Sequence, residues 1–408
     1  MTEQLVIVGG GMAAARLINR LSDLAPDRYR ITLIGAETSM PYDRVQLSSV
    51  LASERSTSEL NLVEPKACKR ILFFQGQRVK SISRATKRVM LADCSTIAYD
   101  KLVLATGSAP IRLPLPGVDR DGVYTFRDLS DVDALSRIEG RAIVIGGGLL
   151  GLEAAHGLAR RGLDVTVVHL MPWLMERQLD REAGGLLKRE LESRGVTFAL
   201  EAESEAIIGG ERVEGLKLKS GEVMPCDHLI MAVGIRPEKT LADAAGLKVG
   251  RGVRVNDQLI TSDENVFAIG ECAEHQGVTY GLVWPVNEQA DVLAAHLAGD
   301  DQAAYGGSAV FTSLKISGVQ LFSAGDFADE IEGDRIFFRD HERGIYKKLI
   351  IRDDRLVGAV LLGDAGDGAW YASLIQDRTP ISAFRDRLMF GRAFVDELPA
   401  GNTVLNAA

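Results

Sequence analysis

Two glycine-rich segments constrain this chain more than any other feature. The first spans residues 5–14 (LVIVGGGMAA) and the second spans residues 142–151 (AIVIGGGLLG). In both, a short apolar strand runs into closely spaced glycines and then into a stretch rich in alanine or leucine. Such glycines allow a tight turn and let the backbone approach a pyrophosphate at the helix N-terminus. One copy is weak evidence, but two copies in one chain predict two bound dinucleotides.

Two dinucleotides on one chain indicate a flavin and a nicotinamide placed face to face, and therefore an oxidoreductase. We expect FAD in the first segment and NADH in the second, with NADPH possible. An acidic residue after the second strand of such a unit binds the adenosine ribose, and Glu37 stands in that position. The residues expected to contact FAD here are Gly9, Gly11, Met12, Ala13, Ala14 and Glu37. The residues expected to contact the nicotinamide nucleotide are Gly146, Gly148, Leu149, Leu150 and Gly151.

Strands and helices alternate around both segments, and the pattern repeats along the chain. The expected elements are strand 5–9, helix 11–24 and strand 30–35, then strand 142–146, helix 148–161 and strand 164–169. Each half also has a later apolar strand that ends in a glycine turn, at Thr106-Gly107 and at Gly234. A third such strand ends at Gly270-Glu271. We expect these three turns to lie close to the cofactors.

These patterns predict an α/β fold with two Rossmann-like dinucleotide-binding domains and a C-terminal α+β interface domain. The FAD-binding domain is expected over residues 1–110 and 236–307, and the NAD(P)H-binding domain over residues 111–235, inserted into the first. Prolines 110, 114 and 116 indicate the connection between them. Residues 308–408 carry no glycine fingerprint. They contain strands, including a hairpin around Asp353-Asp354, and then a tail with a helical pattern.

Composition and charge exclude several classes of function. The net charge of −9 argues against nucleic acid or an anionic membrane as a partner, and no apolar run is long enough to span a membrane. The four cysteines are scattered, with no pair spaced as a redox dithiol or an iron–sulfur ligand set. No histidines are spaced as metal ligands, so we expect no metal. The first strand begins at Leu5, without an export signal before it, so a cytoplasmic location is expected.

Further motifs accompany the glycine segments along nearly the whole chain. They are residues 41–49 (PYDRVQLSS), 146–155 (GGGLLGLEAA), 178–180 (QLD), 234–237 (GIRP), 268–273 (AIGECA), 345–349 (IYKKL) and 358–364 (GAVLLGD). Together they resemble the pyridine nucleotide-disulfide oxidoreductase fold family, in its ferredoxin- and rubredoxin-reductase-like branch. The resemblance is closest to the FAD-binding electron-transfer component of NAD(P)H-dependent assimilatory nitrite and nitrate reductases.

The resemblance implies roles for further residues. Arg44 and Ser48 belong to the stretch near the flavin, with Arg44 in the catalytic site, and Thr106, Gly107, Gly270 and Glu271 belong to FAD-binding loops. Glu153 corresponds to a catalytic carboxylate beside the nicotinamide, and Gly234 to a turn near the same cofactor. Trp284 lies in a segment that the family places near the isoalloxazine, so it is expected to form part of the flavin wall.

The departures from the family narrow the chemistry. Ser49 stands where many ferredoxin reductases have a lysine and where NADH oxidases have a redox cysteine, so no thiol chemistry is expected there. The large nitrite reductases continue into cysteine motifs for iron–sulfur and sirohaem binding, and this chain has none of them. We therefore expect a flavoprotein component that takes electrons from NADH and passes them from the flavin to a separate polypeptide.

Three functions fit these motifs. The first is a reductase component serving the catalytic subunit of an assimilatory nitrate or nitrite reductase. The second is a reductase serving a small ferredoxin- or rubredoxin-like carrier. The third is a flavin-binding redox sensor or assembly protein without turnover. The first is the favoured interpretation, because the motifs resemble the nitrite and nitrate reductase type most closely.

The preference between NADH and NADPH depends on the residue after the second strand of the second unit. An acidic residue there accepts hydrogen bonds from the ribose 2′-OH and repels a 2′-phosphate. This chain has His169 in that position, with no basic residue after it until Arg177. Histidine neither excludes a 2′-phosphate nor supplies the fixed charge of arginine. We expect NADH to be the better donor by a modest margin, with measurable NADPH use.

Overall fold

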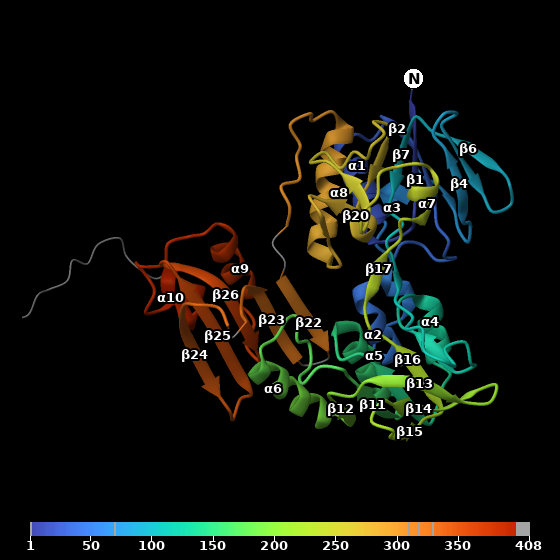
Figure 1. The fold of residues 1–408 in the computed structure, drawn as a ribbon. Coiled ribbons are helices and arrows are strands. Elements are labelled where there is room, and N and C mark those ends of the chain that lie inside the picture. The colour runs from blue at the N-terminus through green and yellow to red at the C-terminus, as the bar shows by residue number, and fades with distance from the viewer. Residues whose placement is uncertain (1, 69–70, 309–310, 317–318, 329, 397–408) are drawn as a thin grey trace, which may run out of the picture.

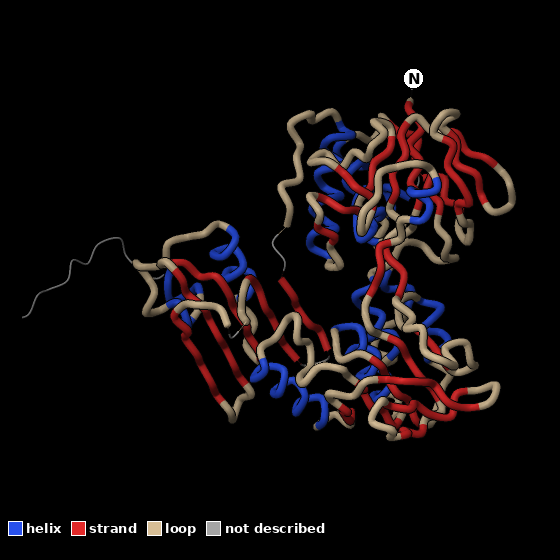
Figure 2. The backbone as a smooth tube through the Cα atoms, in the orientation of Figure 1, coloured by secondary structure: helices blue, strands red, loops and turns tan. Residues whose placement is uncertain are grey.

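A computed structural model of the chain describes residues 2–68, 71–308, 311–316, 319–328 and 330–396. Its secondary structure falls into three bodies that are distinct in Figure 1 and Figure 2. Two of them are built on five-stranded parallel sheets, and the third is built on a five-stranded antiparallel sheet. The expected α/β architecture with two Rossmann-like domains and a C-terminal α+β domain is confirmed.

The first parallel sheet has the strand order β19-β7-β1-β2-β3, which puts the strand of the first glycine segment at its centre. Its strands are β1 (Glu3–Val8), β2 (Tyr29–Ile34), β3 (Ile71–Phe74), β7 (Lys101–Leu104) and β19 (Val266–Ala268). Alternate residues of β1 face opposite layers. Leu5 and Ile7 pack under α1 (Met12–Leu24) and α8 (Val283–Ala298), whereas Val6 and Val8 face the other layer. Both faces are covered, which explains the apolar run of this strand.

The other layer of this domain is a small antiparallel sheet with its flanking helix. It consists of β4 (Val79–Ser83), β5 (Arg88–Leu91), β6 (Thr96–Ala98) and α7 (Thr240–Ala244). Three further strands, β18 (Val253–Val255), β20 (Ala273–His275) and β21 (Val278–Thr279), form a sheet of their own. Short helical segments lie between β2 and β3, namely η1 (Arg44–Gln46), α2 (Leu47–Leu51), η2 (Thr57–Leu60) and α3 (Pro65–Cys68).

The second parallel sheet repeats the first, with the order β12-β11-β10-β16-β9. Its strands and helices are β9 (Val123–Thr125), α4 (Leu129–Leu135), β10 (Arg141–Ile145), α5 (Leu149–Arg160), β11 (Asp164–Val168), α6 (Arg181–Glu192), β12 (Val196–Ala199) and β16 (His228–Met231). The strand of the second glycine segment, β10, is again central and buried along nearly its whole length. An antiparallel sheet of β13 (Ser204–Gly209), β14 (Val213–Leu218) and β15 (Val223–Pro225) completes this domain.

Two antiparallel strands connect the Rossmann-like domains. They are β8 (Ser108–Pro110) and β17 (Ile235–Pro237), which pair with each other where the chain leaves the first domain and returns to it. In Figure 1 the chain passes between the domains beside the label β17. The second domain is therefore inserted in the first, as the sequence repeat predicted. The strand after this connection, β19, pairs with β7 of the first sheet.

The C-terminal domain has an antiparallel sheet with the order β22-β23-β26-β25-β24 and helices at one side. The elements are β22 (Phe311–Ile316), β23 (Val319–Gly325), β24 (Asp334–Asp340), β25 (Ile345–Arg352), β26 (Arg355–Leu362), α9 (Gly368–Gln376), η4 (Leu388–Phe390) and α10 (Arg392–Asp396). The hairpin expected around Asp353-Asp354 joins β25 to β26, and both residues have a positive φ. The domain packs against α6 of the second Rossmann-like domain, as Figure 1 shows.

A buried ion pair joins the C-terminal domain to the second Rossmann-like domain. Asp180 caps α6, with its Oδ1 accepting a hydrogen bond from the backbone N–H of Ala183 at 2.9 Å. Its Oδ2 accepts a hydrogen bond from the Tyr346 hydroxyl at 2.7 Å and lies 3.1 Å from Nζ of Lys348. Tyr346 and Lys348 are two residues apart on β25, so their side chains leave the same face of the strand. The Lys348 ammonium also donates to the carbonyl of Phe327 at 3.0 Å.

We expect removal of the lysine to destabilise the protein strongly, because Asp180 would keep a buried charge without its counter-ion. Lys348→Met should cost about 3–5 kcal/mol of unfolding free energy. Adding Asp180→Asn to Lys348→Met should recover part of that loss, because asparagine still caps a helix without a charge. Urea unfolding of the two single variants and the double variant measures the coupling.

The control is Arg339→Ala, which breaks the pair between Arg339 and Glu182 at the same junction. Both side chains of that pair are about 40% exposed, at 39% and 40%, so its loss should cost under about 1 kcal/mol. If Lys348→Met and Arg339→Ala lowered the free energy of unfolding equally, the pair of Asp180 and Lys348 would not be the main stabilising contact between these two domains.

Candidate functional site

The first glycine loop lies against the end of β7. Gly9 has a φ of +111°, and a Cβ at this position would stand 2.1 Å from the carbonyl oxygen of Ala105, so only glycine fits. Gly11 precedes α1, and a Cβ there would meet nothing within 4 Å. No side chain caps α1, which leaves the N–H groups of its first turn directed at this open space. The loop therefore combines a tight backbone crossing with an open helix N-terminus that suits an anion.

The other two turns predicted to surround FAD meet at the same helix end. Gly270 has a φ of +81°, and a Cβ there would come within 3.0 Å of the Ala13 side chain. Its N–H donates to Oε1 of the fully buried Gln289 at 2.8 Å. The Thr106-Gly107 turn follows Ala105, and the Thr106 hydroxyl donates to the carbonyl of Glu238 at 2.7 Å. Residues from three distant stretches of sequence are thus brought together at the start of α1.

Glu37 lies just beyond β2 and is held by two residues of the 41–49 motif. Its Oε2 accepts a hydrogen bond from the Tyr42 hydroxyl at 2.7 Å, and its Oε1 pairs with the guanidinium of Arg44. Arg44 also donates to the carbonyl of Arg127 at 3.1 Å and lies over the Tyr42 ring, 4.9 Å from its centroid. The carboxylate expected at the ribose and the arginine expected in the catalytic site are therefore direct partners.

Arg127 is a residue of this site that the sequence analysis missed. Its guanidinium pairs with Glu271 and donates to the Ser108 hydroxyl at 2.9 Å, and that hydroxyl donates to Oε2 of Glu271 at 2.7 Å. Arg127 comes from the second Rossmann-like domain, in the turn after β9, whereas Glu271 comes from the first. No motif marks it. Its only signal is an arginine in the short turn between a buried strand and the capping residue Asp128.

The second glycine loop repeats the geometry of the first. Gly146 has a φ of +119°, and a Cβ there would stand 2.4 Å from the carbonyl oxygen of Ala232 at the end of β16. A Cβ on Gly151 would stand 1.9 Å from the carbonyl oxygen of Gly146, so this glycine allows the helix to pack on the loop. A Cβ on Gly148 would meet nothing within 4 Å, and no side chain caps α5. Leu149 and Leu150, also predicted here, form the first turn of α5.

Glu153 lies one turn into α5 and is 5% exposed. Its carboxyl group makes no hydrogen bond or ion pair with the residues that the structure describes. Burial alone raises the pKa of this carboxyl to about 8. A carboxyl that stays protonated at neutral pH can donate a hydrogen bond as well as accept one. His156 follows on the same helix, and neither of its ring nitrogens has a hydrogen-bond partner among the described residues. Burial lowers the pKa of His156, with the positive charge of Arg194 adding to the effect.

His169 lies directly after β11, where the sequence predicted the residue that decides nucleotide preference. Its ring is 8% exposed and covers the second glycine loop, since a Cβ on Gly147 would come within 2.7 Å of its Cγ. The N–H of Gly147 donates to Nδ1 at 3.1 Å. Nε2 lies 3.1 Å from the carbonyl oxygen of Trp173 and 3.1 Å from Oε2 of Glu176. Both ring nitrogens of His169 therefore have partners within the protein.

The remaining predicted residues lie around these loops. Ser48 is nearly buried in α2, which packs on α5 where a Cβ on Gly157 would come within 3.0 Å of Leu51. Trp284 is 53% exposed at the start of α8, and its ring centroid lies 5.9 Å from that of Phe311 in the C-terminal domain. Gly234, with a φ of +123°, precedes the connecting strand β17.

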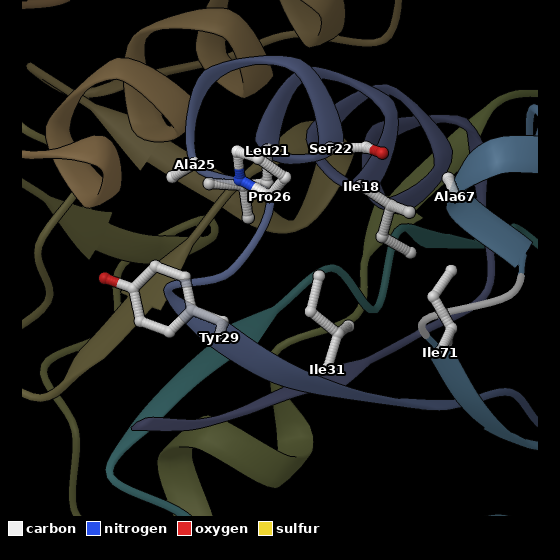
Figure 3. Close-up of a pocket in the computed structure, with 9 residues that line it drawn as sticks. All are labelled: Ile18, Leu21, Ser22, Ala25, Pro26, Tyr29, Ile31, Ala67 and Ile71. Atoms are coloured by element: carbon white, nitrogen blue, oxygen red, sulfur yellow. The ribbon is translucent and has the colours of Figure 1, made fainter. Parts of the chain in front are cut away.

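A small apolar cavity lies away from both glycine loops. It is between the far end of α1 and the strands below it, lined by Ile18, Tyr29, Ile71 and neighbouring residues, which Figure 3 shows. Its volume of about 10 Å³ has room for no more than one water molecule. This cavity is therefore not a cofactor site. The candidate dinucleotide sites are the open helix ends described above.

The part of the chain that the structure describes offers neither a metal site nor a membrane-spanning helix. That part contains no group of three or more His, Cys, Asp or Glu residues that could hold a metal ion. None of its helices has the length and apolar character needed to cross a bilayer. Cys94 is exposed, and Cys226 and Cys272 are buried free thiols. Burial raises the pKa of Cys226 to about 11 and also raises the pKa of Cys272.

Comparisons with known proteins agree with this architecture. Residues 3–295 match the family model of pyridine nucleotide-disulphide oxidoreductases, and residues 311–379 match that of the rubredoxin NAD+ reductase C-terminal domain. The chain belongs to the pyridine nucleotide-disulphide oxidoreductase family. The resemblance inferred from the motifs is thereby confirmed.

Two relatives from Bacillus subtilis are similar over most of this chain. A nitrite reductase [NAD(P)H] is 46% identical over 93% of the chain and 48% of its own length, and an assimilatory nitrate reductase electron transfer subunit is 41% identical over 90% and 48%. The chain thus spans about half the length of these curated relatives. Among solved structures, a covalent putidaredoxin reductase–putidaredoxin complex has a TM-score of 0.84 at 26% identity, covering 93% of this chain and 94% of that chain.

We expect the buried carboxyl of Glu153 to make stability depend on pH. The folded carboxyl keeps its proton up to about pH 8, whereas the unfolded one loses it near its ordinary pKa of 4.5. Stability should therefore fall as pH rises through that window, and Glu153→Gln, which cannot ionise, should remove this fall. Relative to wild type, Glu153→Gln should gain on the order of a few kcal/mol of unfolding free energy between pH 5 and pH 8.

Urea unfolding at the two pH values measures this gain. Glu192→Gln is the matched control, because Glu192 lies on the exposed surface of α6 and pairs with Lys188. It should follow the wild-type pH dependence. If Glu153→Gln also ran parallel to wild type across this range, the buried carboxyl would not be protonated at neutral pH.

Proposed function

We propose that this protein is an NAD(P)H-dependent flavoprotein oxidoreductase that takes electrons from NADH through FAD and passes them to a separate redox protein. The observation that carries the proposal is the pair of matching glycine loops. Each has one glycine that crosses a neighbouring strand and another, Gly11 or Gly148, with open space before an uncapped helix. These are the features that a bound pyrophosphate requires, so the residues fit two dinucleotides.

FAD would be held by the loops that meet at the start of α1, with Glu37 at its ribose. When bound, the flavin accepts two electrons together from a nicotinamide and releases them singly. The protein supplies position and charge around it. Arg44 fixes Glu37, while Arg127 ties the Glu271 loop to the second domain and so sets the separation of the two nucleotide sites. Glu153, protonated at neutral pH, can hydrogen-bond the nicotinamide end of the second nucleotide.

The described thiols support an electron route that leaves from the flavin itself. Cys226 and Cys272 are buried with raised pKa values, so they are protonated at neutral pH and poor nucleophiles. Cys94 lies on the far small sheet, at the turn before β6, and the side chain of Cys68 lies outside the described residues. Free thiols are also the form that cytoplasmic proteins keep, which supports the cytoplasmic location that we propose.

The proposed acceptor is the catalytic subunit of an assimilatory nitrate or nitrite reductase. The two Bacillus subtilis relatives support this acceptor. The nitrite reductase is 46% identical over 93% of this chain, and the nitrate reductase electron transfer subunit is 41% identical over 90%. A small ferredoxin- or rubredoxin-like carrier is the second candidate. The likeness to the putidaredoxin reductase complex and the rubredoxin-reductase type of C-terminal domain favour that candidate.

We also propose the domain division expected from the sequence, with boundaries at 1–110 and 236–307, 111–235, and 308–408. Pairing of β8 with β17 supports the first boundary, because both strands lie at the connection. The change from parallel to antiparallel sheet supports the start of the third domain. Its last residues, 397–408, lie outside the described residues.

A side chain in the open space at Gly11 should abolish FAD binding without unfolding the protein. Gly11→Val adds a branched side chain where the structure has no atoms within 4 Å, so it clashes with a ligand and not with the fold. The purified variant should be colourless, with the unfolding midpoint of wild-type protein stripped of FAD. Gly210→Val is the control, because it also fills open space, in the turn between β13 and β14. A yellow Gly11→Val protein with full flavin content would refute the site.

Purified FAD-loaded protein should reduce ferricyanide with NADH, which separates an enzyme from a redox sensor without turnover. The complex isolated from the native cell should then reduce nitrate or nitrite with NADH as the only donor. If NADH-driven electron flow required a ferredoxin or rubredoxin and no nitrate or nitrite reductase accompanied the protein, the second candidate would replace the first. Absence of any NADH-dependent flavin bleaching would overturn both.

A further inference from the structure

His169 is the residue expected to recognise the ribose, but both of its ring nitrogens already have hydrogen-bond partners within the protein. Because the Gly147 N–H donates to Nδ1, that nitrogen carries no proton, and the ring proton is on Nε2. Nε2 then donates toward Glu176 and the Trp173 carbonyl, each at 3.1 Å. With 8% of the residue exposed, His169 has no free polar atom to offer a nucleotide. The recognition of the ribose must come from another side chain.

Glu176 is the side chain that His169 holds at this place. Its Oε2 is hydrogen-bonded to the histidine. Its Oε1 forms a long ion pair of 3.9 Å with Nε of Arg177, whose side chain is 86% exposed, so this pair is weak. Glu176 itself is 21% exposed, so it is neither buried nor freely mobile. A carboxylate has four acceptor positions, and the contact with His169 uses one of them. The group can therefore still accept hydrogen bonds from a ligand.

The neighbouring surface suits the rest of an adenosine. Leu170 and Met171, the two residues after His169, are 58% and 38% exposed although both are large and apolar. They extend directly from the carboxyl end of β11, beside the open N-terminus of α5. In Rossmann-like domains the adenosine lies over this end of the second strand, with its pyrophosphate at the helix. An exposed apolar pair and an anchored carboxylate thus lie on the side where the ribose and adenine belong.

We propose that Glu176, positioned by His169, is the residue that selects NADH over NADPH. The inference rests on the proposed binding of a nicotinamide dinucleotide in the second domain. The carboxylate accepts a hydrogen bond from the ribose 2′-OH and repels a 2′-phosphate. His169 acts as the positioning residue, and it supplies no positive charge to attract the phosphate while Nδ1 is occupied by the Gly147 N–H. Glu176, which lies seven residues beyond the position where an acidic residue is usual, thereby takes the role of that residue.

The test is Glu176→Gln, which removes the charge and keeps the shape. The glutamine amide oxygen still accepts the hydrogen bond from Nε2 of His169, so the ring and the glycine loop should stay in place. The FAD-loaded protein is first reduced with dithionite without air, so that no hydride transfer can occur, and its binding of NADH, NADPH and the fragments 5′-AMP and 2′,5′-ADP is then measured by calorimetry. Wild type should bind NADH more tightly than NADPH, and 5′-AMP more tightly than 2′,5′-ADP. In Glu176→Gln the ratio of NADPH to NADH dissociation constants should fall by about tenfold or more, since a charge-assisted hydrogen bond and a repulsion are both lost.

The control variant is Glu192→Gln on α6, which removes an exposed carboxylate from the same domain and should leave the ratio unchanged. His169→Ala should also reduce the preference for NADH, because it releases Glu176. An unchanged ratio in Glu176→Gln, with wild type still binding NADH, would overturn this inference alone. Failure of wild type to bind any of the four ligands would instead overturn the proposed function. Unfolding midpoints of all variants establish that each is folded.

Discussion

The structure depends on two places where a glycine lets one strand cross over the end of another. At Gly9 and at Gly146 a single added methyl carbon would lie 2.1 Å and 2.4 Å from a carbonyl oxygen of the neighbouring strand. No side-chain rearrangement can relieve such a contact, because the backbone fixes the position of the Cβ and its partner is a backbone carbonyl oxygen. The crossing brings the chain directly to the start of α1 or α5, with the helix N–H groups facing outward. All other parts of the two sites are arranged around these helix ends.

Contacts between domains then set how the two sites face each other. The Arg127 side chain extends from the second Rossmann-like domain and contacts Glu271 and Ser108 of the first. The backbone carbonyl of Arg127 accepts a hydrogen bond from Arg44. On the opposite side, Asp180 joins the second domain to the C-terminal sheet through Tyr346 and Lys348. Each junction is a partly or fully buried charge pair with additional hydrogen bonds, so a small relative shift of the domains would break these contacts while the charges stay largely buried. The proposed electron transfer needs a fixed distance between the two nucleotide sites, and these junctions favour one.

The sequence predicted the features that have a local cause. Glycine spacing identified both loops, and apolar strands and helical periodicity identified the elements of both sheets, so β1, α1, β2, β10, α5 and β11 lie close to their expected bounds. The acidic residue Glu37 was found because it follows a strand. Arg127 was missed because its role comes from a contact with a residue more than a hundred positions away, which no local pattern encodes. The partners of His169 lie only 4 to 22 positions away, and they were missed because burial of its ring depends on how the loop from 170 to 179 folds back over Gly147.

The two carboxylates proposed to bind the nucleotide riboses differ in how their charge is balanced within the protein. In the first domain Glu37 is paired with Arg44 and bonded to Tyr42, so its negative charge is largely balanced within the protein. In the second, Glu176 is hydrogen-bonded to a histidine whose other nitrogen accepts a backbone hydrogen bond, and the Arg177 side chain that lies 3.9 Å from the carboxylate is 86% exposed. A balanced carboxylate suits a cofactor that stays bound, because it orders the ribose without a net field. A carboxylate whose counter-ion is solvent-exposed suits a nucleotide that must be chosen from two forms differing by a phosphate, because an exposed ion pair is weak and repulsion by the carboxylate can supply the difference in affinity.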